Sequence, residues 1–255
     1  MRWRAWQFCA CHRSYLEVAR RRRHQAVVDS DTELVIEGFP RTANTFAVFA
    51  FQTAQPRPVR LAHHLHASSQ ITAAADRGIP VMALVRPPAD VVVSVVMWWP
   101  YVSPRSAYAA YADFYERIVP YRDRVVVARF DEVTSDFGAV IDRVNERNGT
   151  GFARFEHTRE NVARCYRLIE ERSRLRGSAE AFNAYMSGDI TADQLTAARS
   201  DTPAAAAAPL SEMRVARPSA LRNANRDPVR RTVLEPELSE ARRRAERVYG
   251  ELVGA

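Results

Sequence analysis

The sequence predicts an α/β fold with three layers, α/β/α, in which helices cover both faces of a central parallel sheet. Short runs rich in Val, Leu and Ile, suited to buried strands, alternate with longer segments of helical period. The connections between them are short, and strands that alternate with helices favour parallel pairing. In such a sheet, ligands bind at the carboxyl ends of the strands.

The expected elements follow in chain order. Strands are expected at Leu34–Ile36, Val59–Ala62, Val81–Val85 and Arg124–Arg129. Helices are expected from Phe46, before Pro100, over Asp136–Arg147, over Arg159–Arg199 with a break at Ser173–Gly177, and over Leu234–Leu252. Tyr108, Tyr111, Phe114, Tyr115 and Ile118 recur at helical spacing and predict a buried helix face.

The length of the chain predicts one domain. With 255 residues and 47% apolar composition, the chain can bury one sizeable core. We therefore expect a single domain over residues 29–255, preceded by a basic N-terminal helix or extension over residues 1–28. Thr202-Pro203 and the five alanines that follow predict a linker or lid over residues 200–216.

Residues 1–28 place aromatic side chains such as Trp3 and Trp6 among arginines. A helix of this kind packs on the domain or lies on a membrane surface, and we favour packing. The arginines interrupt any signal-peptide core or membrane span, so no transmembrane segment is expected. An odd number of cysteines, three, implies no disulfide framework and fits a reducing compartment, the cytoplasm.

The charge balance indicates an anionic partner. The formal charge of +7 is carried by arginine alone, because the chain contains no lysine. No zinc-ligand or recognition-helix pattern accompanies the basic excess, so nucleic acid is not expected. An anionic nucleotide cofactor, with or without an acidic acceptor, accounts for the charge.

Residues 33–52 predict a strand, a tight loop and a helix. Gly38 and Pro40 end the strand, and Thr42, Asn44 and Thr45 are residues that favour a helix start. The first backbone N–H groups of a helix lack intrahelical partners and carry the positive end of the helix dipole. The loop is therefore suited to an anion, and Arg41 adds a full charge.

The loop differs from that of nucleoside triphosphatases, because no G-x-x-x-x-G-K-[ST] pattern is present. Instead it resembles the 5′-phosphosulfate loop of the sulfotransferase family, with alanine at the usual glycine and asparagine at a usual hydroxyl position. The resemblance implies a P-loop-like 5′-phosphosulfate loop, and assigns cofactor binding to Arg41, Thr42, Ala43, Asn44, Thr45 and Phe46. We expect negative φ at Ala43, as for most residues with a side chain.

A second segment follows the strand Val81–Val85. Arg86 stands at the strand end, Asp90 follows, and Ser94 lies eight residues after Arg86. This spacing resembles the 3′-phosphate segment of the same family. It allows an arginine at the sheet edge and a serine two turns into the next helix to face one phosphate.

Three histidines cluster after the strand Val59–Ala62. The order His63-His64-Leu65-His66 is similar to the family's Thr-His-Leu-Pro, whose histidine is the general base, and the match falls on His64. If the strand continues through His66, His64 and His66 share one face and His66 is the competitor for this role. A metal tract or surface histidines are the alternatives, and no metal site is expected.

Two further regions are expected to line the site. Trp98, Trp99 and Tyr101 are candidate contacts for the acceptor, and core packing is their alternative role. A late basic loop, Arg217–Arg222, stands where family members close over the 3′-phosphate, which assigns Arg222 to the cofactor. A solvated basic turn is the other interpretation.

The resemblance implies an enzyme that transfers a sulfonate from 3′-phosphoadenosine-5′-phosphosulfate to a hydroxyl of a small molecule or glycan. His64 is then the base and Arg41 neutralises the leaving group, without a metal. The lysine-free, alanine-rich composition suggests a G+C-rich bacterial source. A kinase-like nucleotide phosphotransferase and a non-catalytic protein that binds a nucleotide or sulfated glycan are the alternatives.

Overall fold

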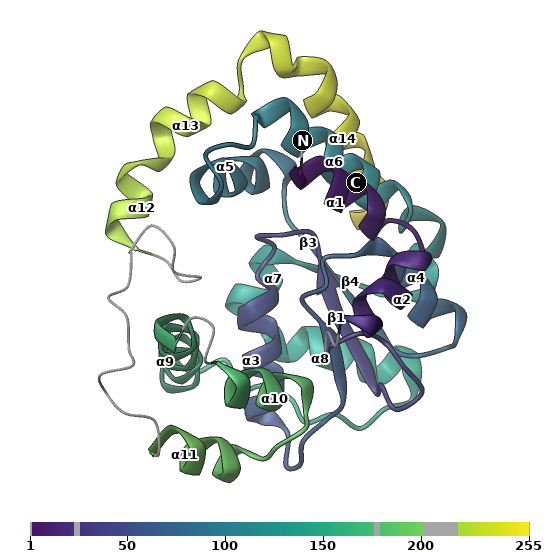
Figure 1. Cartoon of the computed structure of the whole chain (residues 1–255), viewed down its shortest axis with the longest axis vertical. Coiled ribbons are helices and arrows are strands. Elements are labelled where there is room, and N and C mark those ends of the chain that lie inside the picture. Colours follow the sequence, from purple (N-terminus) through teal and green to yellow (C-terminus); the bar gives the residue numbers. More distant parts are fainter. Residues whose placement is uncertain (1, 23–25, 176–178, 201–218, 255) are drawn as a thin grey trace.

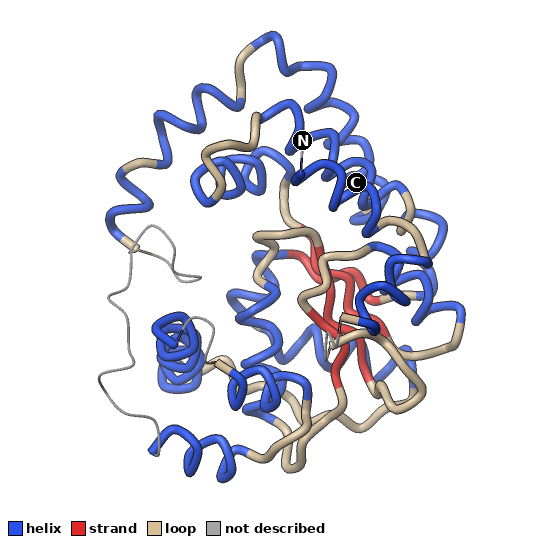
Figure 2. The backbone as a smooth tube through the Cα atoms, in the orientation of Figure 1, coloured by secondary structure: helices blue, strands red, loops and turns tan. Residues whose placement is uncertain are grey.

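The computed structural model describes residues 2–22, 26–175, 179–200 and 219–254. Within these residues the strands β1 (Leu34–Gly38), β2 (Leu61–His63), β3 (Val81–Val85) and β4 (Val126–Arg129) form one parallel sheet of order β2-β1-β3-β4 (Figure 2). The structure confirms the predicted central parallel sheet.

Helices account for most of the remaining chain (Figure 1). The first half contains α1 (Arg2–Ala10), α2 (Ser14–Arg21), α3 (Asn44–Ala54), α4 (Ser68–Asp76), α5 (Pro88–Trp98), α6 (Pro104–Glu116) and the 3₁₀ helix η1 (Val119–Arg124). The second half contains α7 (Phe130–Ser135), α8 (Phe137–Asn148), α9 (Arg159–Leu175), α10 (Glu180–Ser187), α11 (Ala192–Ser200), α12 (Ala220–Ala224), α13 (Arg226–Val233), the 3₁₀ helix η5 (Pro236–Leu238) and α14 (Ser239–Val253).

The two faces of the sheet belong to two separate hydrophobic clusters. Successive strand residues point to opposite faces, so Val35 packs with α4, α6 and α14, whereas Leu34 and Ile36 pack with α3, α8 and α9. Figure 1 shows the sheet between these two groups of helices. The three layers of the predicted fold are therefore present.

The carboxyl ends of the strands meet at one edge of the sheet. Gly38 of β1 pairs with Leu84 of β3, and Ile36 of β1 pairs with His63 of β2, so the loops after these strands emerge side by side. A Cβ atom on Gly38 would lie 2.5 Å from the Leu84 carbonyl oxygen, so the close approach of β1 and β3 requires glycine here.

Tyr115 of α6 fixes the start of the loop that follows β1. Its buried hydroxyl donates to the Leu84 carbonyl at 2.5 Å and accepts from the Phe39 N–H at 3.2 Å. The stripe predicted to be core, which includes Tyr115, is fully buried. This helix therefore contributes to the position of the loop as well as to the core.

The N-terminal segment packs on the domain through buried side chains such as Trp3 and Leu16. The helix expected over Arg159–Arg199 is divided into α9, α10 and α11. Most of the expected linker, residues 201–216, lies outside the described residues. No helix in the described ranges is both long and apolar enough to cross a membrane.

Candidate functional site

The loop between β1 and α3 contains two residues in the left-handed region, Arg41 with φ of 77° and Ala43 with φ of 74°. The prediction of negative φ at Ala43 is wrong. A left-handed residue directly before α3 lets the chain reverse and enter the helix within a short loop, and at this position the side chain of alanine adds strain. Glycine would adopt the same φ without that cost.

The side chains of Thr42 and Asn44 support the loop from inside. The Thr42 hydroxyl donates to the Phe39 carbonyl at 2.8 Å, and the Asn44 amide donates to the same oxygen at 3.2 Å and to the Thr42 hydroxyl at 3.0 Å. Both side chains are buried, and Thr42 does not line the cavity. Its side chain therefore maintains the loop, and only its backbone N–H is left for an anion.

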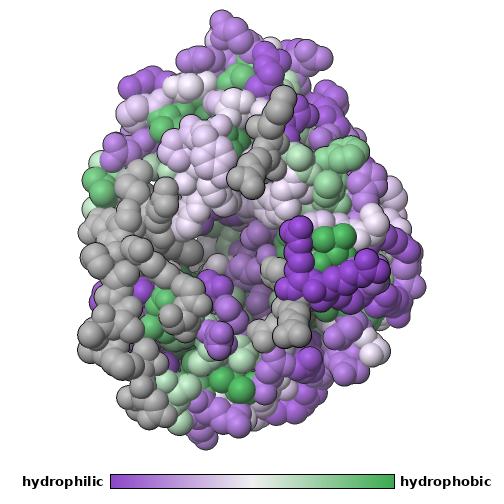
Figure 3. Space-filling model, viewed as in Figure 1, coloured by the Kyte–Doolittle hydropathy of each residue, from purple (hydrophilic) through white to green (hydrophobic). Residues whose placement is uncertain are grey.

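A cavity of about 790 Å³ opens beside this loop. Its lining includes Arg41, Arg86, Arg172 and Arg226, and no described residue that lines it is acidic. Figure 3 shows the same face of the molecule, which is hollowed near its centre. Arg226 is also paired with Asp90, and the other three arginines, on a wall without a carboxylate, favour a ligand with more than one negative charge.

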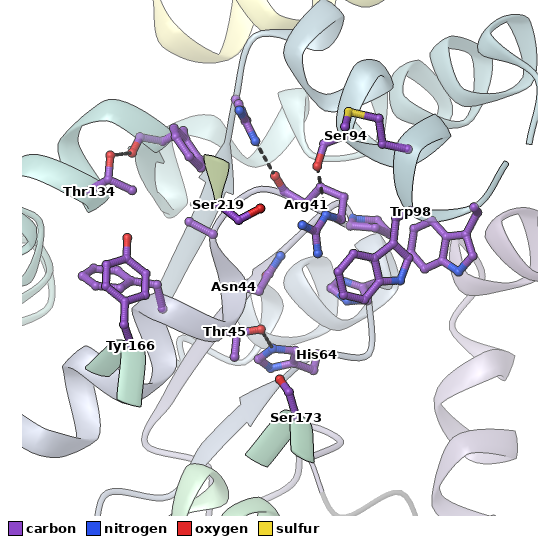
Figure 4. A pocket seen from close by; sticks show the side chains of 18 of the residues that line it. Arg41, Asn44, Thr45, His64, Ser94, Trp98, Thr134, Tyr166, Ser173 and Ser219 are labelled. Atoms are coloured by element: carbon purple, nitrogen blue, oxygen red, sulfur yellow. Dashed lines mark hydrogen bonds between the residues drawn. The ribbon is translucent and has the colours of Figure 1, made fainter. Parts of the chain in front are cut away.

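The two predicted phosphate segments meet at this cavity. Arg41 Nε donates to Ser94 Oγ at 3.0 Å, as a dashed line in Figure 4 shows. Arg86 Nη1 donates to the Arg41 carbonyl at 3.2 Å. The Arg41 guanidinium lies 4.2 Å from the ring centroid of Trp98. The Arg86 guanidinium lies 3.9 Å from the ring centroid of Phe130. Both guanidinium groups are thus held against aromatic rings at the cavity.

The histidine segment reaches the same loop from β2. His64 Nε2 lies 3.0 Å from Thr45 Oγ1, and His64 Nδ1 lies 2.8 Å from His63 Nδ1. His63 Nε2 lies 3.3 Å from Ser187 Oγ. These contacts form a chain of hydrogen bonds from the cavity to the buried Ser187 (Figure 4 shows its first bond).

The chain of hydrogen bonds has two complete proton arrangements. In the first, Thr45 donates to His64 Nε2, His64 Nδ1–H donates to His63 Nδ1, and His63 Nε2–H donates to Ser187. In the second, all three bonds are reversed: Ser187 donates to His63 Nε2, His63 Nδ1–H donates to His64 Nδ1, and His64 Nε2–H donates to Thr45. In the first arrangement the Nε2 lone pair of His64 is directed at the loop. That lone pair accepts the Thr45 hydroxyl, so His64 can serve as a base through Thr45, which lines the cavity, or after an acceptor hydroxyl replaces this bond, and His63 can share the positive charge that His64 acquires.

The condition that the strand continues through His66 is not met. Strand β2 ends at His63, and His64 and His66 have φ of 56° and 51°, so alternation does not decide which side chain faces the cavity. Both histidines line it. His66 Nδ1 lies 2.9 Å from the Gly38 carbonyl oxygen, which ties this ring to the end of β1.

Sequence analysis did not single out Glu37, the residue that holds the histidine turn. Its carboxyl group is inaccessible to solvent, and its Oε2 accepts the N–H groups of Leu65 at 2.9 Å and His66 at 3.1 Å and the Gln70 amide at 3.0 Å. Burial raises the pKa of Glu37 to about 8, although these N–H donors act in the opposite direction. In the sequence, a single Glu within a strand pattern does not indicate that its side chain holds a neighbouring loop.

The other predicted contacts have mixed outcomes. Phe46, Trp98 and Trp99 line the cavity, whereas Tyr101 does not and has 74% of its surface exposed. The side chain of Arg222 lies outside the described residues, as does Arg217. From the same region, the cavity is lined by Ser219, Asn223 and Arg226, which the sequence analysis did not assign.

No family model matches this chain, and no curated protein or solved structure matches it significantly. Among the described residues, no group of three or more His, Cys, Asp or Glu side chains is placed to hold a metal ion. None of the three cysteines forms a disulfide.

The left-handed Ala43 generates a stability prediction. Ala43→Gly should raise the free energy of unfolding by about 1 kcal/mol, because glycine adopts positive φ without strain. Urea unfolding measures the change, and Ala50→Gly, in the middle of α3, is the control that should lower stability. A loss of stability in Ala43→Gly would contradict strain at this position.

The buried Glu37 generates a pH prediction. Its pKa is about 8 in the folded chain against an ordinary value of 4.5, so between these values the folded state holds a proton that the unfolded state has lost. This contribution to stability is complete below pH 4.5 and is lost as pH rises to about 8, by at most about 1.4 kcal/mol per pH unit. Glu37→Gln cannot titrate, so its unfolding free energy relative to wild type should rise from pH 5 to pH 8. Parallel pH profiles for the two proteins would contradict the prediction.

Proposed function

We propose that this chain binds 3′-phosphoadenosine-5′-phosphosulfate and acts as a sulfotransferase towards a hydroxyl acceptor. The observation that supports the proposal most is that Arg41 and Arg86, 45 residues apart in the chain, line one cavity together with Ser94 and His64. Two phosphate-type segments and a candidate base at one carboxyl edge of a parallel sheet fit a ligand with two separate anionic groups.

The residues of the cavity fit such a nucleotide. The N–H groups of residues 44–46 precede the first intrahelical bond of α3, from the Ala47 N–H to the Ala43 carbonyl, so they are left for an anion at the loop. Arg41 adds a charge there. Arg86 and Ser94 are the proposed ligands of the 3′-phosphate. The bound donor would supply the sulfonate and a nucleotide leaving group.

The proton chemistry falls to the histidine pair. The acceptor hydroxyl must lose its proton as its oxygen forms the new bond, and His64 Nε2 is the proposed base. Through the 2.8 Å contact between the two Nδ1 atoms, His63 shares the charge that His64 gains. Arg41 and the helix N-terminus stabilise the negative charge that grows on the leaving group. The three cysteines without disulfides are consistent with a cytoplasmic location, which is part of this proposal.

The first prediction concerns nucleotide selectivity. Wild type should bind 3′,5′-bisphosphoadenosine more tightly than AMP by roughly 1.5–3 kcal/mol for each charge-assisted bond to the 3′-phosphate, tenfold or more. Arg86→Ala should remove most of this preference while AMP affinity changes little. Calorimetric titration with each nucleotide measures the difference in affinity. Arg77→Ala, at an exposed arginine, is the control. Equal affinity of wild type for the two nucleotides would refute the assignment.

The second prediction concerns the base. His64→Ala should lower turnover by roughly 10²–10⁴-fold and leave bisphosphate affinity within a few-fold, because the base acts in the chemical step. His66→Ala is the matched comparison, since His66 lines the same cavity. Transfer of label from the donor to a pool of hydroxylated metabolites is the assay. If His64→Ala kept full turnover while His66→Ala lost it, the role would belong to His66.

A further inference from the structure

Arg172 of α9 lines the cavity but has no part in the proposed nucleotide contacts. Its neighbours on the same wall are Tyr166 and Ser173 of α9 and Asn183 of α10. Figure 4 shows Tyr166 and Ser173 directed into the cavity that Arg41 and His64 also face. Ser94 and Trp98 belong to α5, in the opposite hydrophobic cluster, so the cavity has one wall from α5 and another from α9.

The charge of Arg172 is not balanced by any described carboxylate. Its Nε and Nη2 donate to Asn183 Oδ1 at 3.2 and 2.9 Å, and it forms no ion pair among the described residues. The adjacent acids are committed elsewhere, because Glu170 pairs with Arg174 and Glu171 pairs with Arg199. Burial lowers the pKa of Arg172. A partly buried guanidinium opposed only by an amide oxygen is costly, and an anion in the cavity would offset that cost.

We propose that Arg172, with Asn183, binds an oxyanion of the acceptor, so that the acceptor is a hydroxyl compound that also carries a carboxylate, sulfate or phosphate group. The identification as acceptor rests on the proposed function. In the proposed function, Arg41 and the start of α3 bind the 5′ anionic group of the nucleotide, and Arg86 and Ser94 bind its 3′-phosphate. Arg172 provides a third cationic position, and the amide N–H₂ of Asn183 provides donors beside it, whereas the Ser173 hydroxyl donates to the Ile169 carbonyl at 2.7 Å.

The test is anion binding to protein saturated with 3′,5′-bisphosphoadenosine, which fills the Arg41 and Arg86 positions. Inorganic sulfate and glycolate are the probes, at constant ionic strength, and ethylene glycol is the neutral counterpart of glycolate. Wild type should bind at least one of the two anions, and tenfold or more tightly than ethylene glycol. Arg172→Met should weaken that binding at least tenfold, Arg172→Lys should keep most of it, and Arg167→Met, exposed on the same helix, should not change it. Binding of sulfate but not glycolate would point to a sulfate or phosphate group on the acceptor. Binding of glycolate would point to a carboxylate.

Wild-type affinity in Arg172→Met, or no anion binding to the saturated wild type, would overturn the proposal. If Arg172→Met melts at a lower temperature, Arg172→Gln, which keeps an amide donor for Asn183, replaces it with the same expectation. Should the bisphosphate fail to bind, the proposed function fails instead. The same titrations on nucleotide-free protein would then still show whether an anion site depends on Arg172.

Discussion

The buried carboxyl group of Glu37 joins the two loops on which the site depends. Glu37 is followed by Gly38 and the loop between β1 and α3. Its Oε2 accepts the N–H groups of Leu65 and His66 in the loop after β2. Without this acceptor, the buried N–H of Leu65 and the partly buried N–H of His66 would lose their partner. The direction in which the histidine turn leaves β2 therefore depends on a strand residue of β1.

The cavity combines this geometry with a strongly one-sided charge. Arg41 and Arg86 reach it from the ends of β1 and β3, and Arg172 reaches it from α9, which packs beside α3. The first two guanidinium groups rest on aromatic rings, so ordering them costs little additional entropy. The described lining of the cavity is therefore cationic without acidic side chains, and in an enclosed cavity a charge is felt more strongly than at an open surface.

Much of this could be predicted from the sequence, for specific reasons. The strands and the loop at Arg41 are local patterns, and the parallel sheet brings Arg86 and Ser94 to that loop because their strands are neighbours. The φ of Ala43, the end of β2 at His63 and the role of Glu37 depend on contacts between distant segments. Arg172 lay in a stretch of helix with ordinary surface composition, and only the packing of α9 beside α3 brings it to the cavity.

The alanine at position 43 has a consequence for how the loop would bind the proposed anion. In the absence of an anion, glycine there would let the loop sample many backbone conformations, whereas alanine reduces their number. Ala43 is left-handed, and the bonds from Thr42 and Asn44 to the Phe39 carbonyl support the loop in that shape. Preorganisation of this kind transfers an entropy cost from the binding event to folding, so an arriving anion would find its amide groups already aligned.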